Sequence, residues 1–208
     1  MRRWIVPVMV VAGCAFWAGT ATMRADVTAA QAQASAAQVA LGRQLILSHA
    51  CGECHGGGDN PAADGWLQGT KSPAQEIKLG PMTVRPRNLT PDNTTGLGRF
   101  TERQIFNALR YGLRPGDTAD VDITSMTPGQ GNFPEHPHYL SPAMPWPGWR
   151  HMTDQEIRAV AAYLKRGLKP VVNKVADSDA PQDFWASEVT PEKIGPYPVA
   201  KYPTANEK

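Results

Sequence analysis

The chain has 208 residues, of which 41% are hydrophobic, and a formal net charge of +2. The length suits one domain with extensions, and the near balance of charge means that a nucleic acid partner is not expected. Arg2, Arg3 and Arg24 lie in the first 25 positions, and the rest of the chain carries 18 basic and 19 acidic side chains, a charge of −1.

The N-terminus is typical of an exported protein. Arg2 and Arg3 precede an apolar run over residues 4–18, and charge returns at Arg24. We expect residues 1–25 to be a cleaved signal peptide or a retained membrane anchor, although the apolar run is short for the ~17–25 residues that span a bilayer. Residues 11–14 also resemble a lipobox, in which Cys14 would be lipidated. Each of these fates predicts a periplasmic domain, either free or anchored to the membrane through its N-terminus.

A helix is predicted after a short linker. Residues 26–37 are rich in Ala and Gln and form the linker. Over residues 38–50, Leu41, Leu45 and His49 recur in steps of four, as they do on one face of a helix. This helix is expected to run directly into the next motif.

Residues 51–55 form a Cys-x-x-Cys-His motif, which indicates the covalent attachment of one c-type haem. Cys51 and Cys54 are three positions apart, so on a helical turn they face the same side. Both thiols can therefore form thioethers with the vinyl groups on one edge of a haem. His55 follows directly and is expected to bind the iron from the proximal side.

Three other interpretations of this motif are weaker. A thioredoxin-like pair would need a βαβ context, and a structural zinc site needs four ligands, usually from a second Cys or His pair. The one remaining cysteine is Cys14, so the sequence contains no second pair. A disulfide between Cys51 and Cys54 would leave His55 without a role.

Two further helices are predicted between long loops. Residues 56–86 are irregular, with three consecutive glycines and several prolines, and no strand pattern in the chain is persuasive. Thr101–Gln104 and Thr153–Glu156 are capping boxes, each of which opens a helix. The first helix is expected to end at Gly112 and the second at Gly167. Their apolar positions are Ile105, Phe106, Leu109 and Leu113 in the first and Ile157, Val160, Ala161 and Leu164 in the second.

The remaining segments are loops. Residues 114–147 are dense in Pro and Gly, and residues 172–208 form a proline-rich tail without a period. We therefore expect an all-α fold, with three main helices and long loops around one covalent haem. The haem supplies much of the apolar core of a domain over residues 38–171, and an extended tail follows.

Residues 39–171 resemble the class I c-type cytochromes, which hold one haem between a His and a Met ligand. The closest resemblance is to bacterial cytochromes that accept electrons from periplasmic dehydrogenases. It implies a cytochrome c fold in which the first and last helices cross near Gly42 and Tyr163. The segments that carry it are 42–45, 51–55, 87–92, 95–98, 100–101, 143–147, 152–154 and 162–164.

The resemblance implies a methionine ligand in the loop before the last helix. Met144 fits best, because Pro142 and Pro145 stiffen the loop around it. Met152 precedes the capping threonine of the last helix, where a hydrophobic staple is expected. The other candidates are weaker and comprise Met82, Met126, His49, His136, His138 and His151.

Buried haem propionates need charge-assisted hydrogen bonds. Arg87, Asn88 and Trp146 are the candidate donors. Alternatively, Arg87 is a surface cation and Trp146 contributes only packing.

The resemblance further implies an electron carrier rather than an enzyme. Its partners would be redox proteins, namely a periplasmic dehydrogenase and a respiratory-chain acceptor, held through small interfaces. The tail and the 114–141 loop could dock the chain to the dehydrogenase. The alternatives are a haem enzyme or gas sensor with an open distal iron, such as a peroxidase, and a subunit whose haem only stabilises the fold. A di-haem peroxidase would require a second Cys-x-x-Cys-His motif, which is absent.

Overall fold

The computed structural model describes residues 35–195, 201 and 203–208. The predicted signal peptide or anchor, Cys14 and most of the 26–37 linker lie outside the described residues. The chain divides after Ala37 into two units, and apart from the helical residues 35–37 the described residues belong to the second unit, residues 38–208. Within the described part of the chain, no helix is both long enough and apolar enough to cross a membrane.

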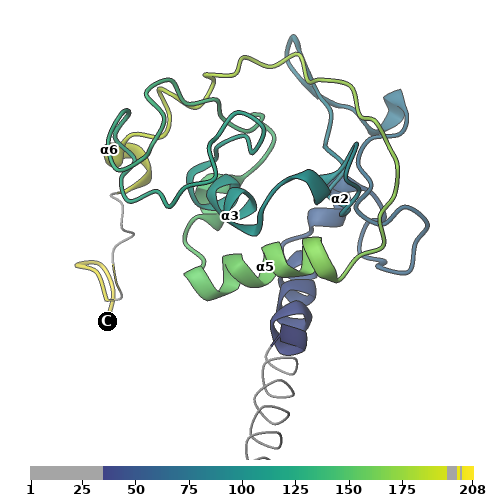
Figure 1. The fold of residues 1–208 in the computed structure, drawn as a ribbon. Helices are drawn as coiled ribbons and strands as arrows, with labels where there is room; N and C mark the ends of the chain where they lie inside the picture. The colour runs from purple at the N-terminus through teal and green to yellow at the C-terminus, as the bar shows by residue number, and fades with distance from the viewer. Residues whose placement is uncertain (1–34, 196–200, 202) are drawn as a thin grey trace, which may run out of the picture. The chain divides into compact units, whose positions relative to one another are not determined.

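Three longer helices frame the second unit, and the predicted, mostly helical fold is confirmed (Figure 1). They are residues 38–48, α3 (Glu102–Tyr111) and α5 (Asp154–Arg166). The shorter helices are α2 (Cys51–His55), α4 (Trp146–Trp149) and α6 (Pro191–Ile194), and the 3-10 turns are η1 (Pro73–Gln75) and η2 (Leu97–Arg99).

Both predicted capping boxes are confirmed. The Gln104 amide donates to Thr101 Oγ1 at 3.1 Å and the Gln104 side chain accepts from the Thr101 amide, which starts α3. Glu156 and Thr153 make the same pair of bonds at the start of α5. Gly112 ends α3 in the left-handed conformation with φ 70°, as expected for a helix stop.

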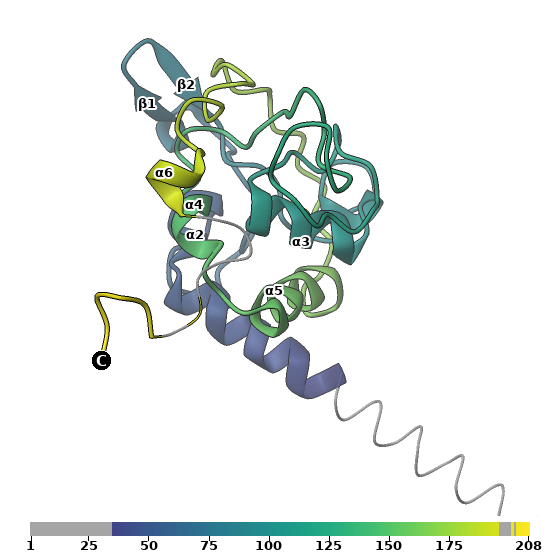
Figure 2. The same cartoon turned by 90° about the vertical axis from the view of Figure 1, so that its left-hand side faces the viewer.

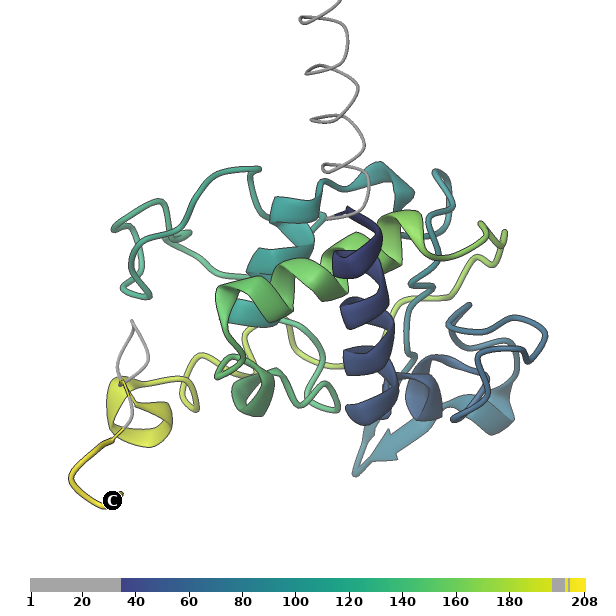
Figure 3. The ribbon, with the colours of Figure 1, turned by 90° about the horizontal axis from the view of Figure 1, so that it is seen from below.

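The first helix crosses α5 at Gly42 (Figure 3). A Cβ atom on Gly42 would lie 1.9 Å from the Ala159 carbonyl oxygen and 2.8 Å from Tyr163 Cβ. Only a glycine allows the two backbones to approach this closely. The crossing that the family resemblance implies, near Gly42 and Tyr163, is therefore present, and α5 contributes Ile157, Val160, Ala161 and Leu164 to the core as predicted.

Two local expectations are wrong. Residues 56–86 contain an antiparallel hairpin, β1 (Ile77–Leu79) and β2 (Met82–Val84), in which Leu79 pairs with Met82. Gly80 opens its two-residue turn at φ 58° and Pro81 completes it, which suits a type II′ turn. Three-residue strands are too short to show alternation in a sequence. The first helix also does not run directly into the motif, because Ala50 takes a left-handed conformation with φ 52° and α2 starts afresh at Cys51.

The tail after α5 follows the surface of the second unit and carries a helix of its own. Asn88 Nδ2 donates to the Val171 carbonyl at 2.7 Å, near the start of the tail. Further along, Arg150 donates to the carbonyl of Ile194 at 2.6 Å, so α6 lies beside α4 (Figure 2). The described tail is therefore not extended throughout, and its course is fixed by hydrogen bonds to the domain.

The Gly42 crossing can be tested by adding one methyl group. We expect Gly42→Ala to lower the free energy of unfolding of the haem-loaded protein by about 1–3 kcal/mol, the usual cost of overpacking. Gly148→Ala is the matched control, because a Cβ atom there meets no atom within 4 Å. Denaturant unfolding measures both variants, and equal stabilities would contradict the close crossing.

Candidate functional site

Helix α2 presents the two thiols and the imidazole of the motif from a single short helix. Cys51 is partly buried, Cys54 is exposed, and neither forms a disulfide. Burial raises the pKa of the Cys51 thiol to about 12, and burial together with the charge of Glu53 raises the pKa of Cys54. Reactive thioredoxin-like cysteines have lowered pKa values, so these neutral thiols do not match a thiol–disulfide enzyme.

A glycine-rich loop packs back onto α2. A Cβ atom on Gly52 would lie 2.1 Å from the Gly58 carbonyl oxygen and 2.4 Å from the ring of Trp66. The Gly69 amide donates to the His55 carbonyl at 2.7 Å, which closes the loop over the end of the helix. The three consecutive glycines were visible in the sequence, but their contact with Gly52 and Trp66 was not.

His55 is buried and held in one orientation. Its Nδ1 atom lies 2.7 Å from the carbonyl oxygen of Arg87, to which the ring donates a hydrogen bond. Burial lowers the pKa of His55, and the bond to the Arg87 carbonyl opposes this shift only in part. The neutral ring with its proton on Nδ1 leaves the Nε2 lone pair available, which is the form that binds a metal.

Beside α2 lies a cavity of about 1000 Å³, lined by all three functional residues of the motif, by Met144 and by side chains from every longer helix. Much of its wall is apolar, as in most cofactor sites. The buried apolar residues in the wall include Ile46, Ile105, Leu109, Val160 and Leu164. A large planar group would therefore complete the core at this place.

The donor set fits iron inside a macrocycle better than a bare metal ion. Among the described residues, no group of three or more His, Cys, Asp or Glu side chains could hold a metal ion. A free ion would therefore have too few protein ligands near His55. A haem brings four nitrogen ligands of its own and needs only axial partners from the protein.

Most rivals of Met144 lie away from the cavity. Among the residues proposed as a sixth ligand, Met144, Met152 and His49 line it, whereas Met82, Met126, His136, His138 and His151 do not. The Met126 sulfur accepts a hydrogen bond from Arg150 at 3.4 Å. The His49 ring lies 2.9 Å from the Leu45 carbonyl oxygen of its own helix.

Met144 lies in a tight turn. Its amide donates to the Ser141 carbonyl at 2.9 Å, and its own carbonyl accepts from the Trp146 amide at 2.9 Å. Met152 lies directly before the capping box of α5, as the sequence predicted. Both sulfur-bearing side chains therefore reach the cavity, and Met144 does so from a turn stiffened by Pro145.

The three candidate propionate donors have different surroundings. The Arg87 guanidinium faces the tail, where it donates to the Val175 carbonyl at 2.7 Å and pairs with Asp177. The Asn88 side chain is buried, and its amide donates to Thr95 Oγ1 and to the Val171 carbonyl. Arg87 and Asn88 both line the cavity. A direct bond from either side chain to a propionate stays a prediction.

Trp146 is completely buried and does not itself line the cavity, although its neighbours Met144 and Pro145 do. Its ring stacks on Tyr139 at a centroid distance of 6.3 Å. Within the described residues, the Trp146 Nε1 donor has no hydrogen-bond partner. A buried donor without a partner requires an acceptor from outside the protein or from solvent, so the role of Trp146 as a propionate donor stays a prediction.

Sequence reasoning missed the Arg87 carbonyl, although it selected Arg87 for its side chain. A backbone acceptor leaves no signature in side-chain identity. Sequence reasoning also missed Arg114 and the tail residues that line the cavity between Lys174 and Gln182. These residues reach the wall only through the path of the folded chain.

Asp92 builds a turn that shapes the wall beside Asn88. One carboxylate oxygen accepts hydrogen bonds from the amide and the hydroxyl of both Thr94 and Thr95, at 2.6–3.1 Å. These bonds, led by that from the Thr95 hydroxyl, lower the pKa of Asp92 to about 2. Thr95 lines the cavity and also accepts from the Asn173 amide at 3.0 Å, so the turn connects the wall to the tail.

Comparisons with known proteins agree with this site. A family model described as "Cytochrome c" matches residues 39–167, which is more than half of the chain. Gluconate 2-dehydrogenase cytochrome c subunit from Pantoea cypripedii is 30% identical over 180 residues, covering 84% of this chain and 34% of that protein.

Two other relatives are likewise cytochrome subunits. Fructose dehydrogenase cytochrome subunit from Gluconobacter japonicus is 28% identical over 155 residues, covering 74% of this chain and 26% of that protein. Alcohol dehydrogenase (quinone), cytochrome c subunit, from Gluconacetobacter polyoxogenes is 33% identical over 96 residues, covering 46% and 16%. The chain thus spans about a third or less of the length of these curated relatives.

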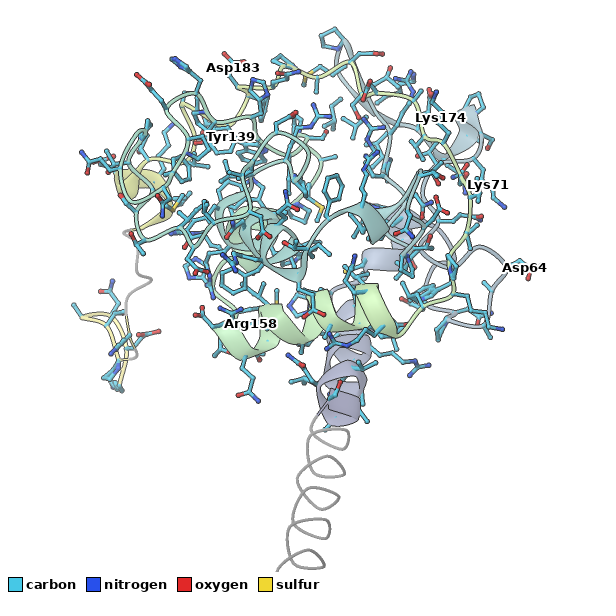
Figure 4. The ribbon with its side chains drawn as sticks, viewed as in Figure 1. Asp64, Lys71, Tyr139, Arg158, Lys174 and Asp183 are labelled. Atoms are coloured by element: carbon cyan, nitrogen blue, oxygen red, sulfur yellow. The ribbon has the colours of Figure 1, made fainter. Side chains whose placement is uncertain are left out.

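The Asp92 turn predicts a distinct acid response. Because the pKa of Asp92 is lowered on folding, the stability it contributes is present at neutral pH and is lost as the pH falls from about 4 to about 2. We expect Asp92→Asn to be less stable than wild type at pH 7 and the difference to shrink over that window, as measured by denaturant unfolding at each pH. Asp64→Asn, at an exposed carboxylate (Figure 4), is the control, and a difference from wild type that does not depend on pH would contradict the assignment.

Proposed function

Because the chain belongs to the cytochrome c family, with covalently bound haem c, we propose that it transfers electrons through one haem held in the α2 cavity. The observation that carries this proposal is the fixed His55 imidazole. Its Nδ1 bond to the Arg87 carbonyl leaves Nε2 available beside a cavity that Met144 also lines. The bound haem supplies one-electron chemistry between Fe(III) and Fe(II).

In this proposal each residue has a separate task. Cys51 and Cys54 hold the haem as thioethers, and their neutral, free thiols suit that role. His55 and Met144 are the axial ligands of the iron. A thioether ligand and an apolar wall both favour the ferrous state, so we expect a raised reduction potential. Arg87, Asn88 and Trp146 remain candidate partners of the propionates.

Electron transfer needs no open coordination position, which separates it from catalysis at the iron. A peroxidase or gas sensor would need a distal side without a protein ligand. His136, His138 and His151 lie away from the cavity and offer no distal catalyst. An electron-transfer subunit without a catalytic centre of its own is therefore the better-supported function.

The partners follow from the relatives. The relatives named above are cytochrome subunits of gluconate, fructose and alcohol dehydrogenases. We propose that a dehydrogenase donates electrons to this chain and that a respiratory-chain protein accepts them. We place the haem domain in the periplasm, free or anchored to the membrane, because of the export pattern in residues 1–25.

The axial ligand is tested by removing one sulfur at a time. Ferric haem with a Met ligand has a weak absorption band in the far red, and we expect Met144→Ala to abolish it, to lower the reduction potential and to let the reduced protein bind carbon monoxide. Met152→Ala is the matched control, because Met152 lines the same cavity but follows α4. The reverse pattern in the two variants would assign Met152 as the ligand, and a high-spin wild type would favour an open iron.

The thioethers are tested by the haem that survives denaturation. We expect Cys51→Ser and Cys54→Ser each to reduce the covalently bound haem detected on a denaturing gel. Cys14→Ser is the control, because Cys14 lies in the predicted export segment, and it should leave the haem signal unchanged. A full signal in Cys54→Ser would contradict the double attachment.

A further inference from the structure

The tail forms one wall of the haem cavity. The segment over residues 174–182, here called the strap, lines the cavity through most of its length. In Figure 4 the labels Lys174 and Asp183 mark its two ends, and Figure 1 shows the same part of the chain passing over the domain between α5 and α6. The strap therefore belongs to the site rather than to a free arm.

One end of the strap is bound to the residue that orients His55. The Arg87 guanidinium donates to the carbonyls of Val175 at 2.7 Å and Ala176 at 3.2 Å, and it pairs with the carboxylate of Asp177. The carbonyl of the same arginine accepts the hydrogen bond from His55 Nδ1. Arg87 thus joins the proximal histidine to the strap through a single residue.

The middle of the strap runs antiparallel to residues 83–87 and is clasped by Arg85. The Arg85 amide donates to Ser178 Oγ at 2.9 Å, and the Arg85 guanidinium donates to Asp179 Oδ1 at 3.2 Å and to the carbonyl of Asp177. The Asp179 amide donates to the Thr83 carbonyl at 2.9 Å. An exposed ion pair contributes little by itself, but main-chain and side-chain bonds act here on consecutive residues.

The other end of the strap is bound to the loop that carries Met144. The Tyr139 amide donates to the Gln182 carbonyl at 2.9 Å. Just beyond the strap, Trp185 Nε1 lies 3.5 Å from the Ser141 carbonyl, and its ring meets Trp146 edge to face at 6.1 Å. The Ser141 carbonyl in turn accepts the amide hydrogen bond of Met144.

We propose that the strap ties the loop behind His55 to the loop of Met144 and thereby holds Met144 at the iron; this inference rests on the proposed function. Methionine is a weak ligand, so its binding depends on how little freedom its loop keeps. A connection that restricts the loop before ligation lowers the entropy lost when the sulfur binds. Arg85 and Arg87 are positioning residues in this arrangement, and the strap acts within the chain instead of serving as a docking arm.

The test uses the full-length, haem-loaded protein and imidazole, which competes with methionine for ferric iron. Arg85→Met removes the guanidinium from the clasp and leaves Arg87 untouched. We expect it to weaken the far-red band of the Met-ligated state and to tighten imidazole binding by about tenfold, the change that the net loss of one or two hydrogen bonds produces. Arg103→Met is the matched control, because Arg103 pairs with Asp120 and Asp122 away from the cavity, and it should keep the wild-type affinity.

A second variant separates the strap from a direct effect of Arg85 on the haem. Ser178→Ala with Asp179→Ala removes the same clasp from the strap side and should tighten imidazole binding similarly. Combined with Arg85→Met it should add little, because residues of one network are not additive. If Arg85→Met cannot be loaded with haem, this double variant decides.

The outcomes that overturn the proposal are distinct. Equal imidazole affinities for Arg85→Met and Arg103→Met would remove the strap's role. An effect of Arg85→Met without an effect of the double variant would assign Arg85 to the haem itself and also reject the strap. A wild-type protein without the far-red band would refute Met144 ligation, and the strap proposal with it, before any variant is compared.

Discussion

The hydrogen bond between His55 Nδ1 and the Arg87 carbonyl is the contact on which the rest of the site depends. It fixes the tautomer of a buried imidazole and directs Nε2 away from the backbone. It also joins two parts of the chain that are far apart in sequence, the motif in α2 and the segment that follows β2. Any movement of residues 85–90 would therefore reach the proximal ligand directly.

Polar side chains hold the long loops where a small helical core could not. Asn88, Thr90 and Asp92 are buried and satisfied by hydrogen bonds to neighbouring loops and to the start of the tail. Lys165, at the end of α5, donates to the carbonyls of Gly98 and Phe100 at 2.7 Å each. Partial burial lowers the pKa of Lys165, yet its ammonium group replaces water as the donor to these carbonyls. Such bonds explain how a chain with so much loop keeps a defined cavity.

The arrangement suits a protein that exchanges electrons without binding a substrate. Cys54 is exposed while His55 is buried, so the edge of the site near the second thiol lies closest to solvent. The wall opposite is closed by helices, by the Asp92 turn and by the strap. A redox centre enclosed on most sides changes its surroundings little between oxidation states, and a small exposed edge is enough for a brief protein contact.

The sequence by itself determined the cofactor, the attachment residues and the proximal ligand, because these depend on residue types at fixed local spacing. The two capping boxes and the end of α3 at Gly112 were predictable for the same reason, since helix signals act within one turn. The short hairpin and the break at Ala50 were not predictable, because three residues show no period and a left-handed alanine has no signature. Only the tertiary structure decided that the Arg87 carbonyl orients His55, that Met126 and three of the histidines lie away from the cavity, and that the tail forms its wall. Those features depend on backbone atoms and on segments brought together across 30 to 90 residues, and local sequence carries no information about either.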